Sequence, residues 1–167
     1  MKIAIISSLF YENYELELMQ NALSFFPDLK LEENEIKKKH FFQNILPHNF
    51  NSIYSQISIA LTNGAMELPQ VAKWLLEKQQ YSGILVLGCV IKGKTSHFEH
   101  VCDVAMRGIA KLALKYETPI SNGIITAYTE KEVVERISSS EKNLGLKAMQ
   151  NLNSMIHLKS KISYDPA

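Results

Sequence analysis

The residues best suited to chemistry lie in the segment Gly88–Glu99, between a long apolar run and a helical pattern. His97 follows Thr95 by two residues and falls in the first turn of the predicted helix. Helix N-termini bind anions through their free N–H groups, so the amides of Lys94 and Thr95 can hold a phosphate. An imidazole beside that phosphate can exchange protons with a bound substrate. The segment therefore predicts a phosphate site with a proton-transfer residue, and a surface or packing histidine is the alternative.

The stretch from Gly88 to Thr95 also matches the nucleotide-binding P-loop pattern Gly-x-x-x-x-Gly-Lys-Thr literally. Three features argue against that interpretation. The residues from Cys89 to Ile91 look like a continuing strand, and this strand comes late in the chain. No later strand ends in an Asp that could hold the Mg²⁺ needed for nucleotide hydrolysis. A P-loop NTPase remains a remote alternative, which ATP binding would test.

A metal site is poorly supported by the same segment. His97 and His100 can share one helix face, but Cys102 would point elsewhere. The only other cysteine is Cys89, and two cysteines are too few for a disulfide scaffold. We therefore expect no metal, two small apolar cysteines and a reducing compartment.

The elements that position these residues alternate between apolar runs and helical patterns. Predicted strands are Lys2–Ser8, a run around Ile57 to Leu61, Gly83–Ile91 and Ile120–Ala127. Predicted helices carry apolar stripes at Leu16–Phe26, Leu68–Leu76, Val101–Tyr116 and Leu144–Ile156, and another starts at the capping box Thr129–Glu132. Such alternation requires right-handed crossovers. The expected fold is a three-layer α/β/α sandwich around a short, mainly parallel four-stranded sheet.

The length, charge and apolar runs of the chain limit the classes of protein to which it can belong. The 167 residues suit a single domain, 1–167, and the net charge of +1 argues against a nucleic-acid-binding protein. No apolar run reaches the length of a membrane span, and no signal peptide is evident, so we expect a cytoplasmic protein. The region Leu29–Ser52, with one possible strand at Leu29–Glu32 and a run of lysines, has no clear role.

Three segments of the chain resemble the 6,7-dimethyl-8-ribityllumazine synthase family. Gly64–Pro69 resembles the family's Gly-Ala-Phe-Glu-Ile-Pro. Leu87–Glu99 resembles Leu-Gly-x-Val-Ile-Arg-Gly-x-Thr-x-His-Phe-Glu/Asp, and this segment is specific enough to carry the assignment. The last strand, Pro119–Thr126, and the following helix with Glu135-Arg136 also match. The similarity is continuous from about Thr62 to Lys159 and returns at the N-terminus.

The resemblance implies a flavodoxin-like fold and a riboflavin-biosynthetic transferase. Family members condense 5-amino-6-(D-ribitylamino)uracil with 3,4-dihydroxy-2-butanone 4-phosphate, releasing phosphate and water. They use no cofactor. The resemblance also implies a homopentamer with sites between neighbouring subunits, built in some members into an icosahedral 60-mer shell.

The family's site residues transfer onto this sequence position by position. His97 is then the proton-transfer residue, and Phe10 stacks on the pyrimidine ring. Ribityl contacts come from Ala65, Met66 and Glu67, and the heterocycle lies against Cys89, Val90 and Ile91. The amides of Lys94 and Thr95 bind phosphate, and Arg136 of the adjacent subunit closes the pocket as a bidentate clamp. Each of these residues alone also fits a core or surface role.

Several positions depart from the family pattern. Asn63 replaces a proline, Met66 a phenylalanine and Lys92 an arginine, and Leu144 stands where a lysine is expected. Asn122 replaces a phenylalanine and makes one apolar wall of the pyrimidine pocket polar. We expect an active enzyme that these changes weaken. The alternative is a non-catalytic or repurposed paralogue that binds a flavin or ribityl-pteridine or acts as an assembly scaffold.

Overall fold

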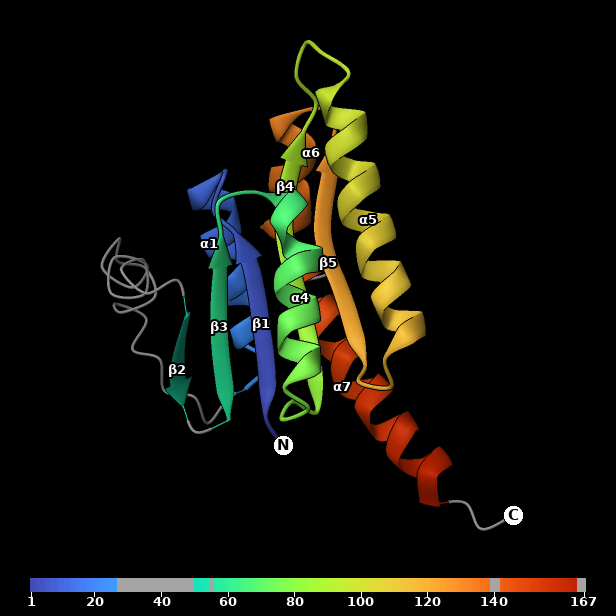
Figure 1. Cartoon of the computed structure of the whole chain (residues 1–167). Coiled ribbons are helices and arrows are strands. Elements are labelled where there is room, and N and C mark those ends of the chain that lie inside the picture. The colour runs from blue at the N-terminus through green and yellow to red at the C-terminus, as the bar shows by residue number, and fades with distance from the viewer. Residues whose placement is uncertain (27–49, 55, 139–141, 165–167) are drawn as a thin grey trace.

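A computed structural model describes residues 1–26, 50–54, 56–138 and 142–164. Its centre is a five-stranded sheet in the order β2-β3-β1-β4-β5. The strands are β1 (Ile3–Ser8), β2 (Phe50–Tyr54), β3 (Ile57–Thr62), β4 (Gly83–Ile91) and β5 (Ile120–Ala127). Figure 1 shows the sheet between helices on its two faces, which confirms the predicted three-layer sandwich.

Four of the strands are parallel, as the sequence predicts, and a fifth strand joins them. The parallel set is β3-β1-β4-β5, and β2 pairs antiparallel with β3 at the edge. The expected sheet had only four strands because Phe50–Tyr54 mixes polar and apolar residues without a clean alternation. The possible strand at Leu29–Glu32 lies outside the described residues.

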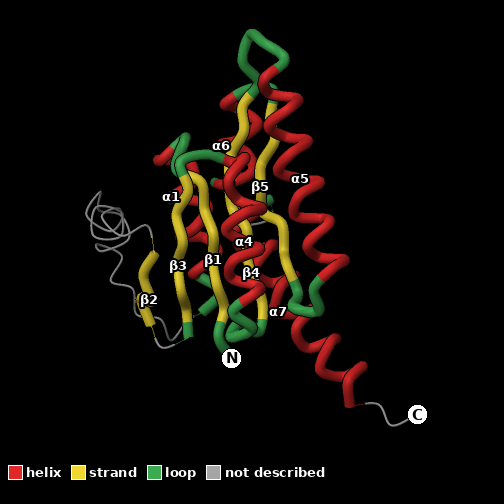
Figure 2. Tube along the Cα trace, viewed as in Figure 1, coloured by secondary structure: helices red, strands yellow, loops and turns green. Residues whose placement is uncertain are grey.

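The two faces of the sheet carry separate cores. Along β1, Ile3 and Ile5 face one core while Ala4 and Ile6 face the other, as the twofold period of a strand requires. The first core is covered by α1 (Glu12–Leu23), α6 (Glu130–Ile137) and α7 (Leu144–Tyr164). The second is covered by α4 (Leu68–Glu77) and α5 (His97–Lys115), which lie in front of the strands in Figure 2. Strands covered on both faces read as continuous apolar runs.

The helix boundaries follow local signals in the sequence, with one correction. The predicted capping box is present, since the Thr129 hydroxyl accepts from the Glu132 N–H at 3.3 Å and starts α6. Helix α1 ends at Leu23, so the prediction that it continues to Phe26 is wrong. Helix α5 begins at His97, which the sequence placed in the first turn of this helix.

Candidate active site

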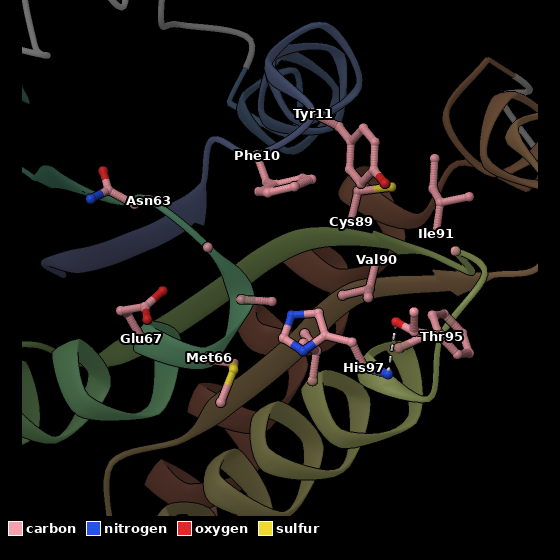
Figure 3. Close-up of a pocket in the computed structure, with 15 residues that line it drawn as sticks. Phe10, Tyr11, Asn63, Met66, Glu67, Cys89, Val90, Ile91, Thr95 and His97 are labelled. Carbon is pink, nitrogen blue, oxygen red and sulfur yellow. Dashed lines mark hydrogen bonds between the residues drawn. The ribbon is translucent and has the colours of Figure 1, made fainter.

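A pocket of about 440 Å³ lies at the carboxyl ends of the parallel strands. This is the edge at which an open α/β sheet binds ligands. The segments after β1, β3 and β4 and the first turns of α5 surround it (Figure 3). Its lining consists of Phe10, Tyr11, Asn63, Gly64, Ala65, Met66, Glu67, Cys89, Val90, Ile91, Gly93, Thr95, His97, Phe98 and Val101.

The pocket exists because the strands end at different levels. The last pair between β1 and β4 is Ser7 with Leu87, whereas β4 and β5 remain paired as far as Ile91 and Ala127. Beyond the end of β1, the continuing strand β4 therefore forms a wall that faces open space. Cys89, Val90 and Ile91 lie on this wall.

An aromatic lip follows β1 on the side facing that wall. Phe10 is 70% exposed, and its ring contacts the Tyr11 ring edge-on at a centroid distance of 5.0 Å. A large apolar side chain left this exposed beside a pocket is well placed to cover a flat ligand. Phe10 was predicted from the sequence for this place, and Tyr11 was not.

The segment after β3 forms the third side. The Thr62 hydroxyl donates to the Gly64 carbonyl at 2.8 Å and shapes the turn that leads into the short helix η1 (Ala65–Glu67). Ala65 is buried, whereas Met66 and Glu67 are exposed at the pocket. The site therefore receives one carboxylate from this side, and Figure 3 shows it away from the His97 ring, on the Met66 side.

The His97 loop closes the fourth side. His97 is the first residue of α5, its exposed imidazole lines the pocket, and its N–H donates to Thr95 Oγ1 at 3.4 Å. Ser96, the N-cap residue, makes no side-chain cap hydrogen bond. The Ser96 side chain therefore does not cap α5, and among the first-turn N–H groups that of His97 has the Thr95 hydroxyl as its acceptor. The positive end of the helix dipole favours an anion at this end.

Lys92, which does not line the pocket, contacts residues on both sides of the loop between β4 and α5. Its ammonium lies 2.7 Å from a Glu99 carboxylate oxygen and over the rings of Phe98 and Tyr128, at 5.7 and 5.3 Å from their centroids. The hydrogen bond to Glu99 raises the pKa of Lys92, and Lys92 lowers the pKa of Glu99. The family's arginine is thus replaced by a cation that ties the end of β4 to the first turn of α5.

The P-loop interpretation is wrong. Gly88 and the three residues after it belong to β4, so the segment between the two glycines is mostly extended strand. A P-loop needs those residues to wrap around a phosphate. Only Lys92 to Ser96 forms the connection to α5.

The Cys89 thiol faces the pocket but is no nucleophile. Burial, together with the nearby Glu15 carboxylate, raises the pKa of Cys89 to about 12. A thiol needs a lowered pKa to attack a substrate at neutral pH. Cys89 therefore serves as a small apolar wall residue, as the sequence suggested.

Three predicted site residues do not line this pocket. Lys94 lies between two lining residues, Gly93 and Thr95, so the loop carries its backbone past the pocket while its side chain is exposed. Asn122 is exposed on β5, donates to Met106 Sδ at 3.0 Å and accepts from the Ile124 N–H at 2.9 Å.

The third, Arg136, lines a second pocket of about 370 Å³ beside α6. This second pocket lies along the end of β5 and also contains Leu144, the residue found where the family has a lysine. Both Arg136 and Leu144 are thus held on a different surface from His97. Within one chain, the structure does not bring Arg136 to the His97 pocket.

Some lining residues were not predicted as site residues: Tyr11, Asn63, Gly64, Gly93, Phe98 and Val101. Position next to Phe10 was the only sequence signal for Tyr11, and the others lie inside the quoted motifs or within two residues of them. In the described ranges, no group of three or more His, Cys, Asp or Glu side chains is arranged to hold a metal. None of the helices in those ranges is long and apolar enough to cross a bilayer.

The fold and the pocket together define a flavodoxin-like α/β protein with a pocket at the strand ends, flanked by the N-terminus of α5. The family model for 6,7-dimethyl-8-ribityllumazine synthase matches residues 1–160, and the chain belongs to that family. Proteins named 6,7-dimethyl-8-ribityllumazine synthase are similar to it. The one from Helicobacter pylori strain G27 is 40% identical over 102 residues, and the one from Helicobacter acinonychis is 39% identical over 102 residues.

These alignments are partial. Each of them covers 61% of this chain and 65% of the Helicobacter protein. The aligned stretch thus spans just under two thirds of the length of these relatives.

Proposed function

We propose that the protein is a 6,7-dimethyl-8-ribityllumazine synthase. It condenses 5-amino-6-(D-ribitylamino)uracil with 3,4-dihydroxy-2-butanone 4-phosphate in the cytoplasm, without a cofactor. The observation that carries the proposal is a single pocket lined by an exposed aromatic ring, a carboxylate, the loop that leads into α5 and a histidine. These are Phe10, Glu67, Thr95 and His97. Family membership makes this reaction the natural use of the pocket.

The two substrates bind at different ends of the pocket. The flat pyrimidine lies between Phe10 and the Val90 wall, and its ribityl chain runs toward Glu67, whose carboxylate accepts hydroxyl hydrogen bonds. The phosphate of the four-carbon substrate binds at the N-terminus of α5, on the amides of Lys94 and Thr95. Holding both substrates in this way converts a bimolecular condensation into an intramolecular one.

His97 then moves the protons that the reaction requires. The amine of the pyrimidine attacks the ketone carbonyl and forms an imine with loss of water. Phosphate leaves, and ring closure with loss of a second water gives the lumazine. Each step adds or removes a proton near the phosphate end of the pocket, where the imidazole of His97 lies. General acid–base catalysis of this kind contributes about 10²–10⁴ in rate.

The direct assay mixes the purified protein with both substrates and follows lumazine absorbance and fluorescence above the uncatalysed rate. We expect acceleration, and a fall of about 10²–10⁴ for His97→Ala. His100→Ala is the matched control, because His100 is exposed on the same helix and does not line the pocket. A folded protein that gives no acceleration would refute the proposal. Equal rates for His97→Ala and the wild type would remove His97 from the mechanism.

We further propose that the active site is completed by a neighbouring subunit in a homopentamer. Arg136 lies outside the His97 pocket of its own chain, so it can clamp the phosphate only in the pocket of another copy. The same holds for any ligand contact by Asn122. Closed cyclic oligomers present each site to such a neighbouring surface.

Subunit mixing tests this arrangement. His97→Ala and Arg136→Ala chains, each nearly inactive alone, are dissociated, mixed in equal amounts and reassembled. Random assembly gives about a quarter of the interfaces both intact groups, so about a quarter of wild-type activity should return. Arg107→Ala is the control for a surface arginine, since Arg107 pairs with Asp103 on α5. If mixing restores nothing, each site uses residues of one chain only.

A further inference from the structure

A buried carboxylate lies beneath the lip of the pocket and has no part in the proposed reaction. Glu15, in the first turn of α1, is 0% exposed. It accepts hydrogen bonds from three donors: the Ser8 hydroxyl, the Tyr11 N–H at 2.9 Å and the Cys89 N–H at 3.2 Å. A charged group buried in a core is costly unless such donors surround it.

The donors come from three separate segments of the chain. Ser8 is the last residue of β1, Tyr11 is the N-cap residue of α1, and Cys89 lies in β4 beyond the end of its pairing with β1. The pairing of β1 with β4 ends at Ser7 and Leu87, so the Cys89 N–H lies beyond it, and Glu15 Oε1 accepts from this N–H. Oε2 accepts from the Tyr11 N–H and caps the start of α1.

Two of these three partners line the pocket, one in the lip and one in the wall. Tyr11 continues the aromatic lip that begins at Phe10, and Cys89 begins the β4 wall that continues to Val90. In Figure 3, Tyr11 and Cys89 lie next to each other at one end of the pocket. One carboxylate thus links the backbone of the lip to the backbone of the wall.

We propose that Glu15 is a positioning residue that fixes the spacing between the Phe10–Tyr11 lip and the Cys89–Val90 wall, and thereby sets the affinity for the flat ring of the substrate. Its effect on the substrate acts through the backbone of Tyr11 and Cys89. The ring-affinity part rests on the proposed function. The spacing part stands on the hydrogen bonds alone.

The carboxylate is chemically difficult to replace. Burial raises the pKa of Glu15, while the hydrogen bonds from Ser8, Tyr11 and Cys89 lower it. Glu15→Gln keeps the size of the side chain but turns one acceptor oxygen into a donor NH₂ group. That NH₂ must face either the Tyr11 N–H or the Cys89 N–H, so one of the two backbone links is lost in every orientation.

The first measurement is hydrogen exchange followed by mass spectrometry on peptides covering residues 9–13 and 87–91. Glu15→Gln should speed exchange at Tyr11 or Cys89 by about tenfold or more, because an unpaired amide opens more readily. Glu12→Gln is the matched control, since Glu12 is exposed in the same helical turn and loses the same charge. Unchanged protection of both amides in Glu15→Gln would overturn the proposal.

The second measurement separates the two substrates. Glu15→Gln should raise the KM for the ribitylaminouracil about ten- to a hundredfold, as for a lost hydrogen bond to a charged group, and leave the KM for the butanone phosphate unchanged. A general loss of folding would change both constants. Glu15→Asp is the second variant if the glutamine variant fails to fold, because its shorter side chain cannot reach both amides. An unchanged KM for the ring substrate would overturn the proposal.

Failure of the proposed function gives a distinct result. If the wild-type protein does not catalyse the condensation, calorimetric titration with 6,7-dimethyl-8-ribityllumazine replaces the kinetics. Weaker binding by Glu15→Gln than by Glu12→Gln then supports the positioning role. Equal binding by both variants, or no binding by the wild type, overturns it.

Discussion

Gly145→Ala should destabilise the protein although it improves helix propensity. Gly145 is buried in the first turn of α7, where this helix packs against α1. A Cβ at this position would collide with the Leu18 carbonyl oxygen and would lie 3.2 Å from the Ala22 nitrogen. Both atoms belong to the backbone of α1, so a change of side-chain rotamer cannot relieve the clash. The two helices must separate by about 1 Å to reach an ordinary contact distance.

The magnitude follows from two opposing effects. Overpacking of a core costs about 1–3 kcal/mol. Because the atoms that clash with the new Cβ belong to a rigid backbone, the cost of Gly145→Ala should lie at the upper end of this range. Alanine in a helix gains about 1 kcal/mol over glycine. We therefore expect Gly145→Ala to lower the free energy of unfolding by about 2 kcal/mol. Because α1 follows Phe10 and Tyr11 directly, the displaced helix should also disturb the aromatic lip of the pocket.

Urea unfolding at a fixed protein concentration, followed by far-UV circular dichroism, measures this effect. The control is Gly93→Ala, because a Cβ there meets nothing within 4 Å and Gly93 has no positive φ. We expect the control to change the free energy of unfolding by less than about 0.5 kcal/mol. A Gly145→Ala protein as stable as the wild type, or more stable, would show that the α1–α7 contact is not as close as described.

Two further predictions concern single side chains. Burial raises the pKa of Cys89 from 9.0 to about 12, which lowers its thiolate fraction at pH 8 about 1,000-fold. Alkylation of Cys89 in the folded protein should therefore be about 1,000-fold slower than in the urea-unfolded protein, and it should accelerate as the pH rises toward 12. Equal alkylation rates in the folded and unfolded protein would contradict the burial of this thiol. Thr129→Ala should lower the free energy of unfolding by about 1 kcal/mol, because it removes the hydroxyl that caps α6, whereas Thr129→Ser should keep the cap. Identical urea midpoints for the two variants would show that the capping box does not contribute to stability.

The parts of the fold that the sequence predicted best are those with one dominant local signal. Strands Gly83–Ile91 and Ile120–Ala127 agree with the prediction at both ends, because apolar runs are bounded there by Ser82-Gly83, Lys92-Gly93 and Pro119. The end of α1 was predicted too late, since Phe26 continues the helical spacing although the helix has already stopped. Strand β2 has no comparable signal, and its pairing with β3 is a tertiary effect.

The residues of the candidate site also fall into those that a local motif predicts and those that only the fold reveals. Motif residues at strand ends, such as Phe10 and His97, meet in one pocket because parallel strands bring their carboxyl ends to one edge. Arg136 was recognisable as a motif residue, but a single chain cannot show which pocket it completes. Glu15 was not predicted, because an acidic residue in a first helical turn is ordinary and only the fold reveals that this one is buried.

The depth of the pocket and the presence of Glu15 have one structural origin. Continuing β4 past the end of β1 creates the wall on which a flat ring can rest. The same step leaves the Cys89 N–H without a strand partner in the interior, where an unpaired amide costs about 1–3 kcal/mol. Lengthening β1 would pair that amide but would also fill the space beside the wall. A side chain reaching over from α1 satisfies the amide and keeps the pocket open, and Glu15 does this while also holding the aromatic lip.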